Sequence, residues 1–135
     1  MRSVRAALAV AATVTVLFAV GELAAQAPPP DWKAPADAKN VKNPEKDSAM
    51  GKKSVETNCA SCHGATGKGD GPAAAALSPK PANWTGDKTK KETDGELFWK
   101  ITNGRGPMPP WKHLPEKERW QIVNYIRELQ GVKKK

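Results

Sequence analysis

Both cysteines of the 135-residue chain lie in one short stretch, NCASCHG at residues 58–64. Cys59 and Cys62 are separated by two residues, and His63 follows directly. Two thiols and an imidazole at this spacing suit four kinds of chemistry: a disulfide, a zinc site, a dithiol redox centre or covalent attachment of haem.

Three of these chemistries leave part of the motif unexplained. A disulfide between the cysteines would close a very short loop, add little stability and give His63 no role. A structural zinc ion needs four ligands, and His113 is the only further candidate. A dithiol redox centre usually lies in a βαβ setting, and no segment alternates convincingly enough for a strand. Haem attachment explains every residue, because each thiol adds to one porphyrin vinyl group and His63 then supplies a nitrogen to the iron.

The surrounding residues predict a small all-α domain with long loops. A short helix is expected over residues 47–58, and Gly51 would let another helix approach it closely. A second helix is expected from about residue 94 to 102, behind the capping-box sequence TDGE. The clearest helix covers residues 115–130, where apolar side chains recur at helical spacing. These helices must position the cysteine motif.

The first 27 residues have the pattern of an export signal. Arg2 and Arg5 precede an apolar run at residues 6–20, and the small-x-small sequence AQA follows at residues 25–27. The run is shorter than the roughly 20 residues that a membrane span prefers, although an uncleaved N-terminal anchor is the alternative. We therefore expect a periplasmic protein, in an oxidising compartment that favours disulfides or haem attachment.

Three further segments follow the signal. Residues 28–46 are predicted to be a tether rich in Pro, Ala and Lys, or a wrap over the domain, with Trp32 as its only large apolar side chain. The folded domain is predicted at residues 47–131 and a basic tail at residues 132–135.

Composition and charge limit the possible partners. With 39% hydrophobic residues, 11 Gly and 12 Pro, the chain has little apolar material, so a large prosthetic group would usefully supplement its core. The net charge is +8, but the basic residues are scattered and form no nucleic-acid motif. We expect a basic surface that steers docking to acidic redox proteins, no nucleic-acid binding, and membrane contact only if the signal stays uncleaved.

Over residues 44–131 the chain resembles a small, exported bacterial mono-haem class I cytochrome c. The resemblance is carried, in this order, by GKKSVETNCASCHGATGKGDGP, DGELFWKITNGRGPMPPW and RWQIVNYIREL. It implies the cytochrome c fold, with three to four short helices and long loops wrapped around one covalently bound haem c. Cys59 and Cys62 would attach the haem, and His63 would be an axial iron ligand.

The resemblance also implies that Met108 is the second axial ligand, because class I cytochromes place this methionine in a Met-Pro segment before the last helix. Met108 has a proline on either side, which stiffens the loop. Met50, which we expect in the core, and His113 are the rivals. A thioether ligand favours ferrous iron, and two strong axial ligands close the iron to oxygen and peroxide.

Several residues around the ligands are further candidates for roles in the site. In the family that this chain resembles, a proline carbonyl orients the ligating histidine. Pro81 is our first candidate for this carbonyl, and Pro72 is the second. Trp99 and Trp111 are expected either to pack against the porphyrin or to be ordinary core residues. Arg105 could pair with a haem propionate or be solvated.

These expectations describe an electron-transfer protein rather than an enzyme. It would pass single electrons from a quinol-oxidising complex or dehydrogenase to a terminal oxidase. One alternative is a haem enzyme or gas sensor whose sixth iron position is open. The other is a fixed cytochrome subunit of a larger respiratory complex, with residues 28–46 wrapping a neighbour.

Overall fold

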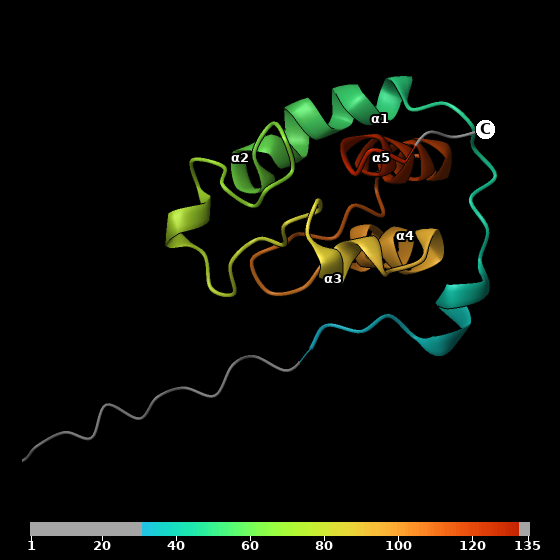
Figure 1. The fold of residues 1–135 in the computed structure, drawn as a ribbon, viewed down its shortest axis with the longest axis horizontal. Helices are drawn as coiled ribbons and strands as arrows, with labels where there is room; N and C mark the ends of the chain where they lie inside the picture. Colours follow the sequence, from blue (N-terminus) through green and yellow to red (C-terminus); the bar gives the residue numbers. More distant parts are fainter. Residues whose placement is uncertain (1–30, 133–135) are drawn as a thin grey trace, which may run out of the picture.

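The computed structural model describes residues 31–132 (Figure 1). The predicted export signal at residues 1–27 and most of the predicted basic tail therefore lie outside the described residues. Within the described residues the fold is helical, as predicted, and contains no strand beyond one isolated bridge between Arg105 and Met108. No helix among these residues is both long and apolar enough to cross a membrane.

The helical segments are short and are joined by long loops. In chain order they are η1 (Ala36–Asn40), α1 (Ala49–Ser54), η2 (Val55–Cys59), α2 (Ala60–His63), η3 (Ala74–Ala76), α3 (Asp87–Lys90), α4 (Asp94–Asn103) and α5 (Glu116–Leu129). The segments η1 and η3 are 3₁₀ turns, and η2 is π-helical.

The first helix runs through the cysteine motif, further than the predicted end at residue 58. The segments α1, η2 and α2 follow one another without a break, and α2 ends at His63 where Gly64 turns the chain with a φ of 76°. Residues three and four apart share one face of a helix. Cys59, Cys62 and His63 are therefore presented together on one face of a helix.

The first and last helices cross at very close range, as expected from Gly51. A Cβ atom on Gly51 would lie 2.0 Å from the Gln121 backbone oxygen, so only glycine allows this approach. Figure 1 shows α1 beside α5 at this crossing. The buried hydrophobic core consists of Val55, Trp84, Leu97, Ile101, Trp120, Ile122, Val123 and Ile126.

Two buried polar side chains of α5 hold the segment that leads into α1. Gln121 accepts a hydrogen bond from the Met50 N–H at 3.1 Å, at the start of α1. Asn124 donates to the Asp47 carbonyl at 2.6 Å and accepts from the Asn43 side chain, also at 2.6 Å. Because buried amides need partners, these bonds tie residues 43–50 firmly to α5.

The segment predicted as a tether, or as a wrap over the domain, packs on the domain in its described part. Its 3₁₀ turn η1 buries Ala38, which is 6% exposed, against the start of α4. A Cβ atom on Gly95 of α4 would lie 2.0 Å from the Ala38 carbonyl oxygen. Helix α4 begins with the predicted capping box, in which Thr93 and Glu96 exchange side-chain-to-backbone hydrogen bonds of 3.3 and 2.7 Å.

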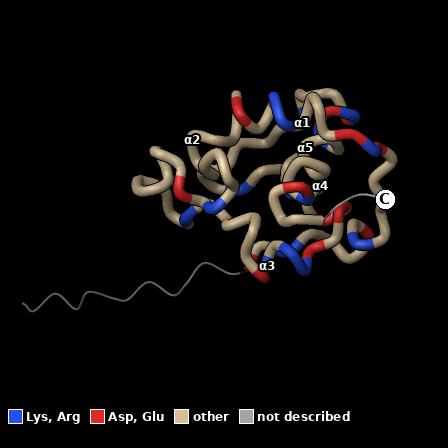
Figure 2. Tube along the Cα trace, turned by 45° about the horizontal axis from the view of Figure 1, so that its top comes forward, with Lys and Arg blue, Asp and Glu red and all other residues tan. Residues whose placement is uncertain are grey.

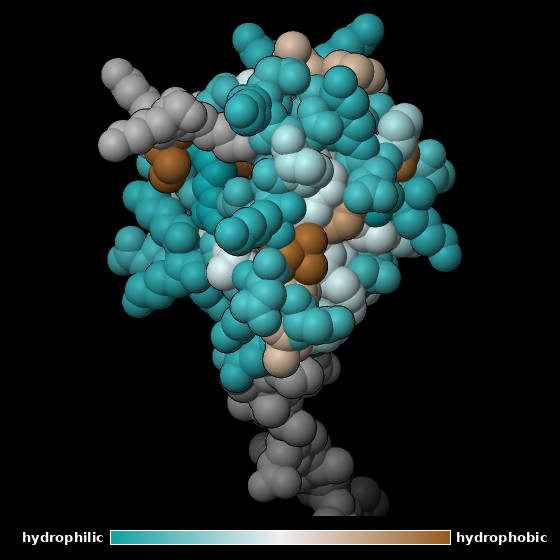
Figure 3. Space-filling view, turned by 90° about the vertical axis from the view of Figure 1, so that its right-hand side faces the viewer, coloured by the Kyte–Doolittle hydropathy of each residue, from teal (hydrophilic) through white to brown (hydrophobic). Residues whose placement is uncertain are grey.

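The face of the molecule seen in Figure 3 is mostly hydrophilic. Figure 3 shows one face on which hydrophobic residues form small, separate areas. The large hydrophobic side chains that are exposed are Val41, Met50 and Val132. Isolated apolar residues of this kind are normal on the surface of a folded domain.

Candidate cofactor site

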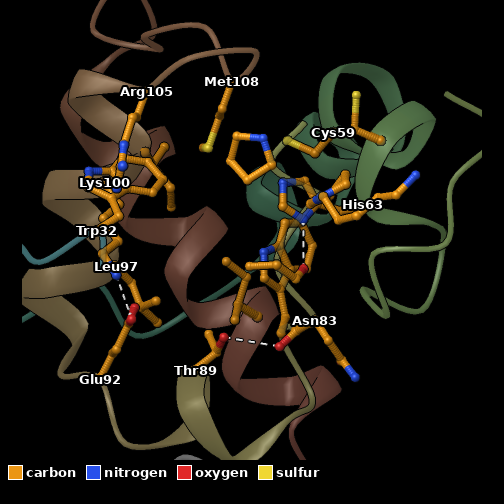
Figure 4. Close-up of a pocket in the computed structure, with 18 of the residues that line it drawn as sticks. Trp32, Cys59, His63, Asn83, Thr89, Glu92, Leu97, Lys100, Arg105 and Met108 are labelled. Carbon is orange, nitrogen blue, oxygen red and sulfur yellow. Dashed lines mark hydrogen bonds and ion pairs between the residues drawn. The ribbon is translucent and has the colours of Figure 1, made fainter. Parts of the chain in front are cut away.

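A cavity of about 540 Å³ lies between the cysteine helix and the loop that follows α4. This volume falls in the range of about 300–1,000 Å³ that is typical of small-molecule and cofactor sites. Cys59, Cys62 and His63 line one side, and Met108 points into the cavity from the loop (Figure 4). Folding thus brings together all four residues predicted to attach haem or bind iron.

The two thiols lie at the cavity edge and are not joined in a disulfide. Burial raises the pKa of Cys59 to about 12, and the neighbouring Cys62 thiol contributes in the same direction. Cys59 is therefore a neutral thiol at neutral pH. A thiol in this form carries both the sulfur and the hydrogen that add across a vinyl double bond when a thioether forms.

His63 is held as a neutral imidazole with one nitrogen available. It is 8% exposed, and burial lowers its pKa, although a hydrogen bond to Ala82 acts in the opposite direction. Nδ1 lies 3.0 Å from the Ala82 carbonyl oxygen, which can only accept, so Nδ1 donates and Nε2 keeps its lone pair. The prediction that the carbonyl of Pro81 or Pro72 orients His63 was wrong. The carbonyl that accepts from His63 belongs to Ala82, the residue directly after Pro81.

The ring of His63 also stacks on Trp84, which the sequence analysis missed. The ring centroids are 4.3 Å apart and the planes are inclined by 20°. Trp84 is 7% exposed and is fixed through its backbone: its N–H donates to Gly67 at 2.7 Å, and its carbonyl accepts from the Gln130 side chain at 2.7 Å. The only sequence signal was a large aromatic residue in an otherwise polar, extended segment.

Met108 is held by a tight backbone turn. Arg105 and Met108 exchange two backbone hydrogen bonds of 2.9 and 3.0 Å. Gly104 precedes this turn with a φ of 60°, and a Cβ atom there would lie 2.5 Å from the Met108 carbonyl oxygen. The Trp111 N–H then donates to Ile101 of α4 at 3.0 Å, which returns the loop to the domain.

Neither rival for the second axial position lines the cavity. Met50 is 50% exposed, so the expectation that it packs in the core was wrong. Gly51 and Val55 occupy the α1–α5 contact instead, and Met50 lies about 100° around the helix from Gly51. His113 is exposed and lies beside Trp111, with ring centroids 5.4 Å apart.

The remaining predicted residues divide into two groups. Trp111, Pro81 and Arg105 line the cavity, whereas Trp99 does not. The cause is helical geometry, because α4 turns Leu97 toward the cavity and Trp99 lies about 200° further around the same helix.

The residues present fit a haem group. The cavity offers two thiols, one imidazole nitrogen and one thioether, and its apolar walls include Trp84, Leu97, Ile101, Ile122 and Ile126. Iron in a porphyrin takes such nitrogen and sulfur axial ligands. Zinc fits less well, because no cluster of three or more His, Cys, Asp or Glu side chains suited to a metal occurs between residues 31 and 132.

Comparison with known protein families gives one match to a family model. The family described as cytochrome c oxidase, cbb3-type, subunit III matches residues 46–126, which is more than half of the chain. The match contains the cysteine helix, the loop with Met108 and most of α5.

The similar individual proteins are described as an oxidase subunit, a chain of a protein complex and a c-type cytochrome. The cbb3-type cytochrome c oxidase subunit CcoP of Azospirillum sp. (strain B510) is 41% identical over 95 residues, covering 63% of this chain and 29% of the relative. A chain of the Kuenenia stuttgartiensis reducing HAO-like protein complex has a TM-score of 0.56 and 27% identity, covering 66% of this chain and 45% of that chain. The c-type cytochrome KustC0563 has a TM-score of 0.49 and 24% identity, and the match covers 62% of this chain and 98% of that chain.

Proposed function

This chain belongs to the family of cbb3-type cytochrome c oxidase subunit III and thus carries covalently bound haem c; on that premise, we propose that it transfers single electrons through a His/Met-ligated iron. The observation that carries the proposal is the placement of His63 and Met108 around one cavity, with Cys59 and Cys62 at its edge.

Each residue has a distinct role in the proposal. Cys59 and Cys62 anchor the haem through thioethers, and Nε2 of His63 binds the iron. Bound haem c supplies reversible one-electron chemistry between ferric and ferrous iron. Met108 provides a soft sulfur ligand, which favours the ferrous state and keeps other ligands from the iron.

The surrounding structure keeps this arrangement fixed. Ala82 and Trp84 set the orientation of the His63 ring through a hydrogen bond and a stacking contact. The turn between Arg105 and Met108 limits where the thioether can move. Apolar walls exclude water, so the iron environment needs little rearrangement when its charge changes.

The proposed partners are redox proteins with acidic docking surfaces. A quinol-oxidising complex or dehydrogenase would supply the electron, and a terminal oxidase would accept it in the periplasm. Basic and acidic side chains are interspersed over the described part of the chain (Figure 2), while the whole sequence carries a net charge of +8. Such an excess attracts acidic partners over long range.

A second candidate is a fixed subunit of a larger respiratory complex. Two similar proteins support it, because one is an oxidase subunit and the other is a chain of a protein complex. The present chain spans less than a third of the CcoP relative's length. Co-purification from native membranes separates the candidates: a carrier is released by salt, whereas a fixed subunit remains with its complex.

The experiment that tests the central proposal is maturation in a host that attaches haem c. The purified protein should be heavier than its polypeptide by one haem, and its spectrum should change reversibly between oxidised and reduced forms. A Cys59→Ser, Cys62→Ser double variant should lose the added mass, whereas Ser61→Ala, at the exposed position between them, should keep it. A colourless wild-type protein of unmodified mass would refute the proposal.

A further inference from the structure

One wall of the cavity comes from outside the part of the chain that matches the family. The match covers residues 46–126, yet Trp32 lines the cavity. Figure 4 shows Trp32 beside Lys100, on the other side of the cavity from Cys59 and His63. The family match therefore does not account for this contact.

Trp32 belongs to a segment that crosses the domain surface, which we name the strap and define as residues 31–41. One end lies where Asp31 and Lys88 of α3 form an exposed ion pair at 2.6 Å. The other end is the turn η1, whose Ala38 is buried against Gly95 at the start of α4. Trp32 lies between these two attachments, only a few residues from each, so its position is restricted.

The indole of Trp32 lies against an ion pair that also lines the cavity. Lys100 Nζ is 2.5 Å from a carboxylate oxygen of Glu92 and 5.4 Å from the centre of the Trp32 ring. The Lys100 and Glu92 side chains are only 13% and 18% exposed. An aromatic ring over a largely buried ammonium contributes an attractive contact and keeps water from it.

We propose that the strap closes the haem cavity and that Trp32 raises the reduction potential by keeping water from this wall. The proposal rests on the proposed function, since it requires haem c in the cavity. Water near the iron stabilises the ferric state, which carries one more positive charge than the ferrous state. A wall residue that excludes water therefore favours the reduced protein.

The first test compares substitutions at two tryptophans in the matured, full-length protein. Trp32→Ala should lower the midpoint potential measured by redox titration, while Trp32→Phe, which keeps an aromatic wall, should retain most of the wild-type value. Trp99→Ala is the matched control, because Trp99 does not line the cavity. Equal potentials for Trp32→Ala and the wild type would overturn the proposal.

The second test displaces the strap without changing any residue that lines the cavity. Gly95→Ala places a Cβ atom 2.0 Å from the Ala38 carbonyl oxygen, although alanine suits the α4 helix better than glycine does. The midpoint potential of the Gly95→Ala variant should fall, as that of Trp32→Ala does. Combining the two substitutions should cause no further fall, because both act through the same wall.

The outcomes separate this inference from the proposed function. Intact mass and spectrum are measured first, and absence of haem from the wild type would refute the function itself. With haem attached, an unchanged midpoint potential in Gly95→Ala would overturn the proposal that the strap closes the cavity. An effect of Gly95→Ala that is equally large with and without Trp32 would also overturn it.

Discussion

The rings of His63 and Trp84 lie face to face, with their centroids 4.3 Å apart. The imidazole is therefore fixed in two ways, by the Ala82 carbonyl in the ring plane and by the indole against the ring face. One contact limits rotation of the ring, and the other limits its displacement. Contacts that hold the Trp84 indole in place therefore also orient His63, the proposed iron ligand.

Replacing Trp84 should destabilise the protein and loosen this ligand. Trp84→Ala removes a buried side chain, and large-to-small changes of this kind cost about 3–5 kcal/mol. Chemical denaturation of the matured protein measures this loss. Trp84→Phe, which keeps a ring against His63, should lose less, and equal losses in both variants would show that stacking is unimportant.

Replacing Met108 should open the iron to external ligands. Met108→Ala should allow the ferrous protein to bind carbon monoxide and should lower its reduction potential, because the soft sulfur donor is gone. Absorption spectra before and after addition of carbon monoxide measure the change. Met50→Ala, at an exposed position outside the cavity, is the control and should behave as wild type. Carbon monoxide binding by the untreated wild type would instead support an enzyme or sensor.

A methyl group at Gly51 should force α1 and α5 apart. The added Cβ atom would lie 2.0 Å from the Gln121 carbonyl oxygen, and overpacking typically costs about 1–3 kcal/mol. Thermal melting of Gly51→Ala should show the loss. Lys52→Ala, at the next and exposed position, should leave the melting temperature nearly unchanged. A stable Gly51→Ala variant would contradict the close crossing.

Removing the N-terminal cap of α4 should have a smaller effect. Thr93→Ala deletes the side-chain acceptor for the Glu96 N–H, and loss of such a cap costs about 1 kcal/mol. The comparison is with Thr57→Ala, since Thr57 is exposed within a helix and caps nothing. Denaturation midpoints that shift equally in the two variants would show that the cap contributes no stability.

Electron exchange with an acidic redox protein should slow as salt is added. The excess of basic residues, which remains after loss of the predicted export signal with its two Arg and one Glu, accelerates encounter at low ionic strength, and screening can reduce such steering by on the order of tenfold. Stopped-flow rates across a salt series measure this effect. An uncharged small-molecule reductant should show almost no salt dependence, and a protein partner that behaves in the same way would contradict docking by charge.

Local signals predicted the helices well where the helix ends are set by nearby residues. The capping box at Thr93 and the asparagine–glycine pair at Asn103 bounded α4 almost to the residue, because both signals act within one helical turn. The proline at position 115 located the start of α5 equally well. The close approach at Gly51 followed from the small size of glycine.

Predictions failed where distant parts of the chain decide the outcome. Trp84 is in the site because the Gly67 loop and Gln130 hold its backbone, and these residues are far away in the sequence. The carbonyl that meets His63 belongs to Ala82 rather than Pro81, a difference of one residue that depends on the path of a loop. For the segment that contains Trp32, the sequence left both a tether and a wrap over the domain open, because nothing in its neighbourhood shows that η1 docks on α4.

The bond between Gln130 and Trp84 has a consequence for how the molecule is completed during synthesis. Gln130 is just beyond α5, so the ribosome produces it long after the cysteine motif, yet it holds the backbone behind the His63 ring. A chain whose C-terminal residues have not yet packed leaves the His63 ring without this support. Packing of the C-terminal residues therefore completes the site of the proposed iron ligand.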